Sequence, residues 1–265
     1  MNRGLKRGLG SVLGVLMGVG LILATPVRAE TITGQKDKSC GELTVGWIDW
    51  PPYQMVGKDN DSSQPVGVDI QAARKYLGAL GCDLKFVSKP WARLLKAMEE
   101  GRLDVLLGMS KTDERSKYAK FSSPYRNETV WLFMRSNQHD FDHFTSLKDI
   151  IGTQFRLGVS RNAYYGDEYL KLIEDPKFKS RVFQAIGGEN FQMLISDRVD
   201  GFLVDKETGK ARIEADGLQG QIVPHNNVKV DLGPVHIMFG KNSISSGLLE
   251  KLNGIIKKEV EVPQS

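Results

Sequence analysis

Residues 84–107 read LKFVSKPWARLLKAMEEGRLDVLL, and this stretch decides the fold. Residues 84–87 suit a short strand. Residues 90–101 begin with a proline, carry their large apolar residues on one helical face and end at a glycine, which predicts a helix. Residues 104–107 form a continuous apolar run, as expected of a strand inside a parallel sheet. The order strand–helix–strand therefore predicts a βαβ unit.

The same alternation continues on both sides of this unit. The pattern strand–helix–strand–helix–strand occurs twice in the sequence, once before and once after about residue 135. We expect an α/β fold with two similar lobes and mostly parallel sheets, in which ligands bind beyond the carboxyl ends of the strands. Further strands are expected at 43–48, 130–134, 156–159, 182–184, 201–204 and 235–239, and further helices at 68–80, 145–150, 164–173, 190–196, 207–215 and 248–258.

The N-terminus has the layout of a secretory signal peptide. Three basic residues precede an apolar run from 9 to 24, and the small-residue site Val27-Arg28-Ala29 follows. A membrane anchor is the alternative, but the run is short for a bilayer, which needs about 20 apolar residues. We expect residues 1–29 to be removed by cleavage after Ala29, and the mature protein to be periplasmic.

The charge of the mature chain excludes some classes of partner. The whole sequence has 36 Lys and Arg against 32 Asp and Glu. Four of the basic residues and none of the acids lie in 1–29, so the mature chain would have 32 of each. No bulk charge then favours nucleic acid or a membrane surface.

Two cysteines are present, and both lie in the exported part of the chain. Cys40 precedes one predicted strand and Cys82 precedes the strand expected beside it, so we predict one disulfide; two buried free thiols are the alternative. Neither the cysteines nor the scattered histidines have the spacing of a metal site. A nucleophile elbow and a phosphate loop are also missing from the sequence, and we expect no cofactor.

The residues that follow the predicted strands come in a characteristic order. They read LTVG (43–46) with WPPY (50–53), VGVDI (66–70), PW (90–91) with GRLD (101–104), GMSKTDER (108–115), FSSPY (121–125), LGV (157–159) and VDGFLVD (199–205). This ordered set resembles the bacterial extracellular solute-binding proteins of family 3, the polar amino-acid binders of ABC importers. The resemblance spans nearly the whole mature chain.

The resemblance implies a two-lobed periplasmic-binding-protein fold of type II. Lobe 1 would comprise 40–133 plus 232–265, and lobe 2 would comprise 134–231. Two crossover strands, near 133–136 and 231–234, would form the hinge. The implied function is capture of a small zwitterion, a polar amino acid, for import through an ABC permease in the inner membrane, by a monomer that catalyses nothing.

A buried zwitterion needs one fixed cation and one fixed anion, because an unpaired buried charge is costly. Arg115 follows the strand 104–107 by a short loop, and Thr112 can cap its helical turn. The resemblance places the arginine that binds the ligand carboxylate here, where two parallel hydrogen bonds are possible. The alternative is a surface ion pair. Asp205 ends the strand 201–204, and the resemblance assigns it to the ligand ammonium; it could equally cap the next helix.

Two further loops would contribute to the same site. Ser110 offers a hydroxyl and an amide, or simply stabilises a turn, and Gly108 offers backbone only. Residues 160–164 precede a predicted helix, so their amides could meet a carboxylate. The family has Gly then Ser or Thr where this chain has Asn162 and Ala163, followed by Tyr164, and Asn can adopt a left-handed conformation. Arg161 could favour an acidic ligand side chain or be a solvated loop cation.

Aromatic residues would form the walls of the site. Trp50 and Trp91 stand where the resemblance places the walls around the ligand side chain, with Tyr53 beside them; core packing is the alternative. Two other functions remain open. The chain could be an orphan binding protein that signals to a membrane sensor. It could also be an enzyme like cyclohexadienyl dehydratase, for which Glu128 and Asp205 would be the candidate acids.

Overall fold

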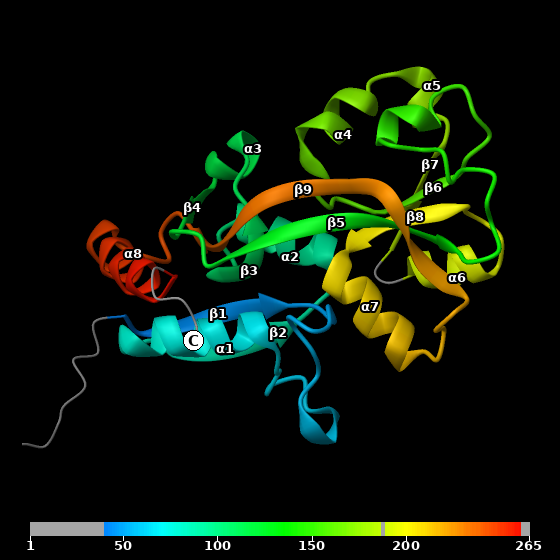
Figure 1. Ribbon diagram of the computed structural model, residues 1–265. Helices are drawn as coiled ribbons and strands as arrows, with labels where there is room; N and C mark the ends of the chain where they lie inside the picture. Colours follow the sequence, from blue (N-terminus) through cyan, green and yellow to red (C-terminus); the bar gives the residue numbers. More distant parts are fainter. Residues whose placement is uncertain (1–39, 187–188, 261–265) are drawn as a thin grey trace, which may run out of the picture. The chain divides into compact units, whose positions relative to one another are not determined.

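Strands that are far apart in the sequence join into one mixed sheet in the order β2-β1-β3-β9-β5-β8-β6-β7, with β4 also paired to β9 (Figure 1). This computed structural model describes residues 40–186 and 189–260. The strands are β1 (Glu42–Trp47), β2 (Asp83–Ser88), β3 (Val105–Ser110), β4 (Ala119–Phe121), β5 (Arg126–Arg135), β6 (Leu157–Ser160), β7 (Val182–Ala185), β8 (Gly201–Asp205) and β9 (Ile222–Gly240).

The helices follow the strands along the chain, as the alternation predicts. They are α1 (Val68–Ala79), α2 (Trp91–Glu99), α3 (Asp113–Ser116), α4 (Gly166–Leu172), α5 (Pro176–Lys179), α6 (Glu189–Ile195), α7 (Lys206–Ala215) and α8 (Ser246–Val260), with 3₁₀ helices η1 (Lys58–Asn60) and η2 (Leu147–Ile150). None of the helices in the described ranges is long and apolar enough to cross a membrane.

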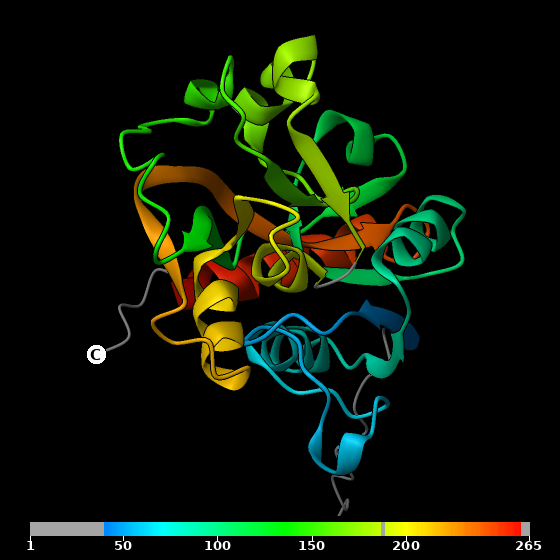
Figure 2. The same cartoon turned by 90° about the vertical axis from the view of Figure 1, so that its right-hand side faces the viewer.

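Two parallel triplets lie at the two ends of the sheet. β1 pairs in parallel with β2 and β3, and β6 pairs in parallel with β7 and β8. The long strands β5 and β9 run antiparallel to each other between them, and each also pairs with a strand of one triplet (Figures 1 and 2). The expected α/β class with two mostly parallel lobes is therefore confirmed.

Each triplet has its own hydrophobic core. Two clusters of buried residues draw on β1–β3, α1, α2, α8 and the end of β9, and we call this part lobe 1. Two others draw on β5–β8, α4, α6, α7 and the start of β9, and we call this part lobe 2. Separate cores let two lobes move as units about the strands that they share.

The pairing of the two shared strands shifts at two places. One shift lies between Glu128 and Thr129, opposite a bulge where Gly233 has φ +70°, and the other lies between Trp131 and Phe133. A glycine tolerates this left-handed conformation without strain. The bulge lies within the expected second crossover, 231–234, whereas Val130 and Leu132 already belong to a core cluster of lobe 2.

Several local predictions are confirmed. α2 begins directly after Pro90, and Gly101, with φ +69°, follows its end. Cys40 and Cys82 form a disulfide, which joins the segments that lead into β1 and β2. These strands are in register from Glu42 opposite Asp83, so the two cysteines are brought together where the strands begin.

Other elements differ from the prediction. β9 covers Ile222–Gly240 instead of only 235–239, because pairing to β5 overrides the poor strand propensity of its Pro, Asn and Gly residues. α4 begins at Gly166 rather than at 164. The expected helix 145–150 is the 3₁₀ helix η2, which has a capping box at its N-cap residue Ser146. The proposed signal peptide lies outside the described residues.

Candidate functional site

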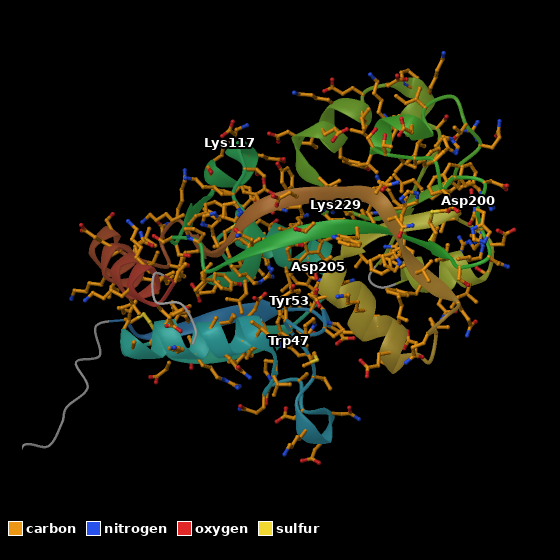
Figure 3. The ribbon with its side chains drawn as sticks, in the orientation of Figure 1. Trp47, Tyr53, Lys117, Asp200, Asp205 and Lys229 are labelled. Carbon is orange, nitrogen blue, oxygen red and sulfur yellow. A yellow bond between two sulfur atoms is a disulfide. The ribbon has the colours of Figure 1, made fainter. Side chains whose placement is uncertain are left out.

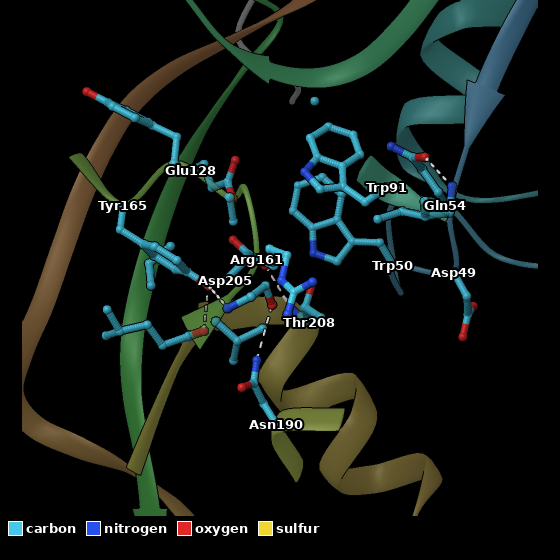
Figure 4. A pocket seen from close by; sticks show the side chains of 18 of the residues that line it. Asp49, Trp50, Gln54, Trp91, Glu128, Arg161, Tyr165, Asn190, Asp205 and Thr208 are labelled. Atoms are coloured by element: carbon cyan, nitrogen blue, oxygen red, sulfur yellow. Dashed lines mark hydrogen bonds between the residues drawn. The ribbon is translucent and has the colours of Figure 1, made fainter. Parts of the chain in front are cut away.

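A cavity of about 570 Å³ lies between the two lobes, at the carboxyl ends of strands from both parallel triplets. Residues after β1, β2 and β3 line it from lobe 1, and residues after β6 and β8 line it from lobe 2 (Figure 4). The predicted site residues that line this cleft are Trp50, Trp91, Gly108, Ser110, Arg115, Arg161, Ala163, Tyr164 and Asp205.

Tyr53 is the exception, since it lies beside the cleft rather than in its lining. Its side chain is buried, its ring lies 5.1 Å from that of Trp50, and its hydroxyl hydrogen-bonds the Asp205 carboxylate. Tyr53 belongs to lobe 1 and Asp205 to lobe 2, and Figure 3 shows them near each other between the lobes. Burial and the nearby carboxylate raise the pKa of Tyr53, so it stays a hydrogen-bond donor.

Arg115 lies on the short turn α3, as the sequence predicts. The side chain of Thr112 caps this turn by accepting a hydrogen bond from the Arg115 amide. The guanidinium is fixed by one hydrogen bond, which its Nη1 donates to the Ser110 carbonyl at 2.9 Å. It forms no ion pair with any described residue, so its charge is available to the cleft. Burial lowers the pKa of Arg115, which is the expected effect of moving a cation out of water.

Asp205 ends β8 and caps α7, so the expected N-cap is confirmed. Its Oδ1 accepts hydrogen bonds from the amides of Glu207 at 3.0 Å and Thr208 at 2.9 Å. The carboxylate is therefore fixed in orientation by its own helix, and it lines the cleft from lobe 2. Burial raises the pKa of Asp205, and the hydrogen bond from the amide of Thr208 opposes this change.

Gly108 and Ser110, expected in a loop, belong to the end of β3. The Gly108 amide already donates to the hydroxyl of Tyr125 at 2.8 Å, so it is not free for a ligand. Gly108 has φ +67°, and a side chain here would meet Asp69 and Trp50 at 2.8 Å. Glycine at this position therefore leaves space for the side chains of Asp69 and Trp50. Ser110 lies in the cleft wall and is buried.

The segment after β6 also departs from expectation. The amides of Ser160, Arg161 and Ala163 donate to other protein groups, and α4 begins only after Tyr165. Three of the five amides expected to meet a ligand carboxylate are therefore already bonded within the protein, and a role of this segment in ligand binding stays a prediction. Asn162 does adopt the expected left-handed conformation, with φ +61°.

Two polar contacts bridge the lobes at the edge of the cleft. The indole Nε1 of Trp91 donates to the Asn162 carbonyl at 3.2 Å. The guanidinium of Arg212 pairs with Asp49 at 3.2 Å. In Figure 4, Trp50 and Trp91 lie on one side of the pocket, and Glu128, Asp205 and Tyr165 lie on the other.

The sequence analysis missed several polar residues that line the cleft. Asn190 is buried, and its Nδ2 donates to the Ser160 hydroxyl at 3.1 Å while its Oδ1 has no hydrogen-bond partner among the described residues. Others are Gln54, Lys89, Tyr165, Thr208 and Arg212. No residue spacing marks them, because they come from different segments that only the fold brings together. Glu128 was considered only as a candidate enzymatic acid.

Glu128 lies on β5 and is the most strongly perturbed acid of the cleft. Its side chain is almost fully buried, and burial raises its pKa to about 8; Arg126 opposes this change and Asp205 adds to it. Arg126 is itself committed to Asp69, with contacts of 2.9 and 3.2 Å to the two carboxylate oxygens. Its guanidinium also packs 3.8 Å from the ring of Tyr53.

No cluster of His, Cys, Asp and Glu that could hold a metal ion occurs in the ranges 40–186 and 189–260. Charged groups, aromatic faces and neutral polar side chains converge in the cleft, and the charged residues of its lining are Lys89, Arg115, Arg161, Arg212, Asp49, Glu128 and Asp205. Such a set can bind an organic ion by hydrogen bonds and ion pairs.

Comparison with known families identifies the chain. The sequence profile of the bacterial extracellular solute-binding proteins, family 3, matches residues 43–261. The chain belongs to this family.

Individual relatives are distant but cover most of the sequence. The arginine-binding extracellular protein ArtP of Bacillus subtilis is 24% identical over 212 residues, which are 79% of this chain and 77% of that protein. An ancestral arginine-binding protein solved with bound arginine is 25% identical with a TM-score of 0.69, covering 83% of this chain and 93% of its own. A membrane-bound lytic murein transglycosylase F of Alcanivorax borkumensis is 25% identical over 74% of this chain but only 40% of its own length.

Proposed function

We propose that this protein binds a zwitterionic polar amino acid in the cleft and delivers it to an ABC permease in the inner membrane. The observation that carries the proposal is the pair Arg115 and Asp205, which line one cavity from opposite lobes. One is an arginine without a counter-ion among the described residues, and the other is a carboxylate fixed by two helix amides. The ligand carboxylate would pair with Arg115, and the ligand ammonium would pair with Asp205.

Binding would couple to closure, because each charge of the ligand is met by a different lobe. A ligand that touches both lobes stabilises their approach by its differential contacts with the closed form. The bridges from Trp91 to Asn162 and from Arg212 to Asp49 would add to this stability. The indoles of Trp50 and Trp91 would cover the ligand side chain, and an affinity of about −8 kcal/mol, or micromolar, is expected.

The names of the relatives support an amino acid as the ligand, and arginine is the first to test. Arg161 lines the cleft but is exposed, so it would act at the entrance. The boundaries that we propose for the lobes are 40–133 plus 232–265 and 134–231, and Val130 and Leu132 on the shared strand β5 pack into the core of lobe 2 from the lobe 1 side of this boundary. We propose a monomeric, periplasmic protein that is exported by the signal peptide 1–29.

Calorimetry tests the proposal. The mature protein is titrated with each standard L-amino acid, and at least one should bind with micromolar affinity or better. The Arg115→Ala variant should bind at least about 100-fold more weakly while melting like the parent, because Arg115 pairs with no described acid. No heat from any amino acid, polyamine or small organic acid would refute the proposal.

Catalysis is the second candidate, and the buried acid Glu128 in the cleft is the observation that favours it. Arogenate and prephenate are the substrates to test, by following their dehydration spectroscopically. The binding proposal predicts no conversion of either compound, and recovery of the bound amino acid unchanged. Turnover that disappears in Glu128→Gln would favour the enzyme instead.

A further inference from the structure

Glu128 is a polar group of the cleft that the zwitterion scheme leaves unused. Its side chain is 8% exposed, and it lines the cavity from the strand β5 that both lobes share. In the described part of the chain its carboxyl group has no hydrogen bond and no ion pair. A buried carboxyl without a protein partner is unusual, because such groups are nearly always satisfied, and this one belongs to the lining of the cavity.

Two cations act on Glu128, and both also contact other groups. Asp69 binds Nε and Nη2 of Arg126, whose Nη1 has no hydrogen-bond partner among the described residues, and Arg115 donates its Nη1 to the Ser110 carbonyl. The charged and titratable side chains that act on Glu128 come from β5, β8, α1, α3 and the segments after β1 and before α4; they are Arg126, Asp205, Asp69, Arg115, Tyr53 and Tyr165.

Adding these charges gives a neutral interior only when Glu128 is protonated. Arg126 and Asp69 cancel, and Arg115 and Asp205 match the carboxylate and ammonium of a zwitterion. A ligand with a second cationic nitrogen would bring one uncompensated positive charge into the closed cleft, at a cost of several kcal/mol. Ionised Glu128 would remove that imbalance.

We propose that Glu128 is a specificity-determining residue, which pairs with a second cationic nitrogen of the ligand and releases its own proton to solvent as that nitrogen binds. This inference rests on the proposed function and names the ligand class: amino acids with a cationic side chain. The indoles of Trp50 and Trp91, on the other side of the pocket, would cover the stem of such a side chain (Figure 4).

The size of the effect follows from the state of the free protein. With a pKa of about 8, the Glu128 carboxyl is about nine-tenths protonated near pH 7, so binding should release about 0.9 proton per ligand. Since only the ionised form pairs with the cation, the affinity should rise about 50-fold from pH 6 to pH 8 and then level off. A neutral ligand of the same shape should show neither effect.

The experiment is calorimetry in two buffers that differ in ionisation enthalpy, which gives the number of protons released. L-Arginine, L-lysine and L-ornithine are compared with the neutral L-citrulline and L-glutamine, citrulline being nearly isosteric with arginine. The tightest ligand should be cationic and should release close to one proton. Glu128→Gln should abolish the release and weaken the cationic ligand at least about ten-fold at pH 8, sparing the neutral ones.

Glu114→Gln is the matched control. Glu114 precedes Arg115 on α3 but is exposed and outside the cleft, so its loss should leave the proton release unchanged. Tightest binding of a neutral or acidic amino acid without proton release would overturn the inference and leave the proposed function intact. Unchanged proton release when the ligand binds to the Glu128→Gln variant would also overturn the inference. Absence of binding by every amino acid would instead refute the proposed function. The pH series on the parent needs no variant, so a folding defect cannot obscure the result.

Discussion

Replacing Asp205 separates the two roles of this residue, because Asn can keep one and not the other. Asp205 caps α7 through its Oδ1, which accepts hydrogen bonds from the amides of Glu207 and Thr208. Asn is as good an N-cap as Asp, so Asp205→Asn should change the free energy of unfolding by no more than about 0.5 kcal/mol. Asp205→Ala removes the cap and should cost about 1–2 kcal/mol.

Ligand binding should respond differently to the same two substitutions. Both remove the buried carboxylate that we assign to the ligand ammonium, and breaking a buried ion pair costs about 3–5 kcal/mol. The dissociation constant should therefore rise at least about 100-fold in both variants. Urea denaturation gives the stability and calorimetry gives the affinity. If Asp205→Asn binds the amino acid as tightly as the parent, Asp205 is only a helix cap and the assignment is wrong.

Three further predictions concern stability. Replacing Cys40 and Cys82 by Ala should lower the free energy of unfolding by about 4 kcal/mol, because the disulfide closes a loop of 42 residues; a loss below about 1 kcal/mol in urea denaturation would contradict this. Gly108→Ala should lower the free energy of unfolding by about 1–3 kcal/mol and the melting temperature by several degrees. The added Cβ would lie 2.8 Å from a carboxylate oxygen of Asp69, and the residue has a positive φ. An unchanged melting curve would show that the backbone adapts freely at this position. The Glu128 carboxyl binds its proton more tightly in the folded protein, where burial raises the pKa from 4.5 to about 8, so the free energy of unfolding should fall as the pH rises from about 5 to about 8. Glu128→Gln should reduce this fall by a few kcal/mol, about 1.4 kcal/mol per unit of pKa, and a parallel pH profile in both proteins would show that Glu128 titrates normally.

The fold follows from the sequence wherever local signals agree with the tertiary structure. The βαβ unit at 84–107 has a proline start, an apolar face and a glycine end, and β2, α2 and β3 form where these signals lie. β9 was mostly missed because its first half carries residues that favour turns. It is a strand because β5 supplies partners from Ile222 to Val235, which is information about distant residues that no local pattern contains.

The candidate site could be predicted where residues follow buried strands. Arg115 and Asp205 follow β3 and end β8, and the carboxyl ends of parallel strands meet at a cleft in this kind of fold. Asn190 escaped because it lies within a helix, and Glu128, which lies within a strand, was named only as a candidate enzymatic acid. Their burial and their missing partners become visible only once the lobes are assembled.

The role of Arg115 can be measured most directly by changing the ligand and the protein together. The tightest amino acid and its carboxamide, which lacks the carboxylate charge, are titrated into the parent and into Arg115→Ala. The parent should prefer the free acid at least about 100-fold, the expected value of a buried charged pair, and the variant should bind both forms with nearly equal affinity. A variant that keeps the parent's preference would show that another group recognises the carboxylate.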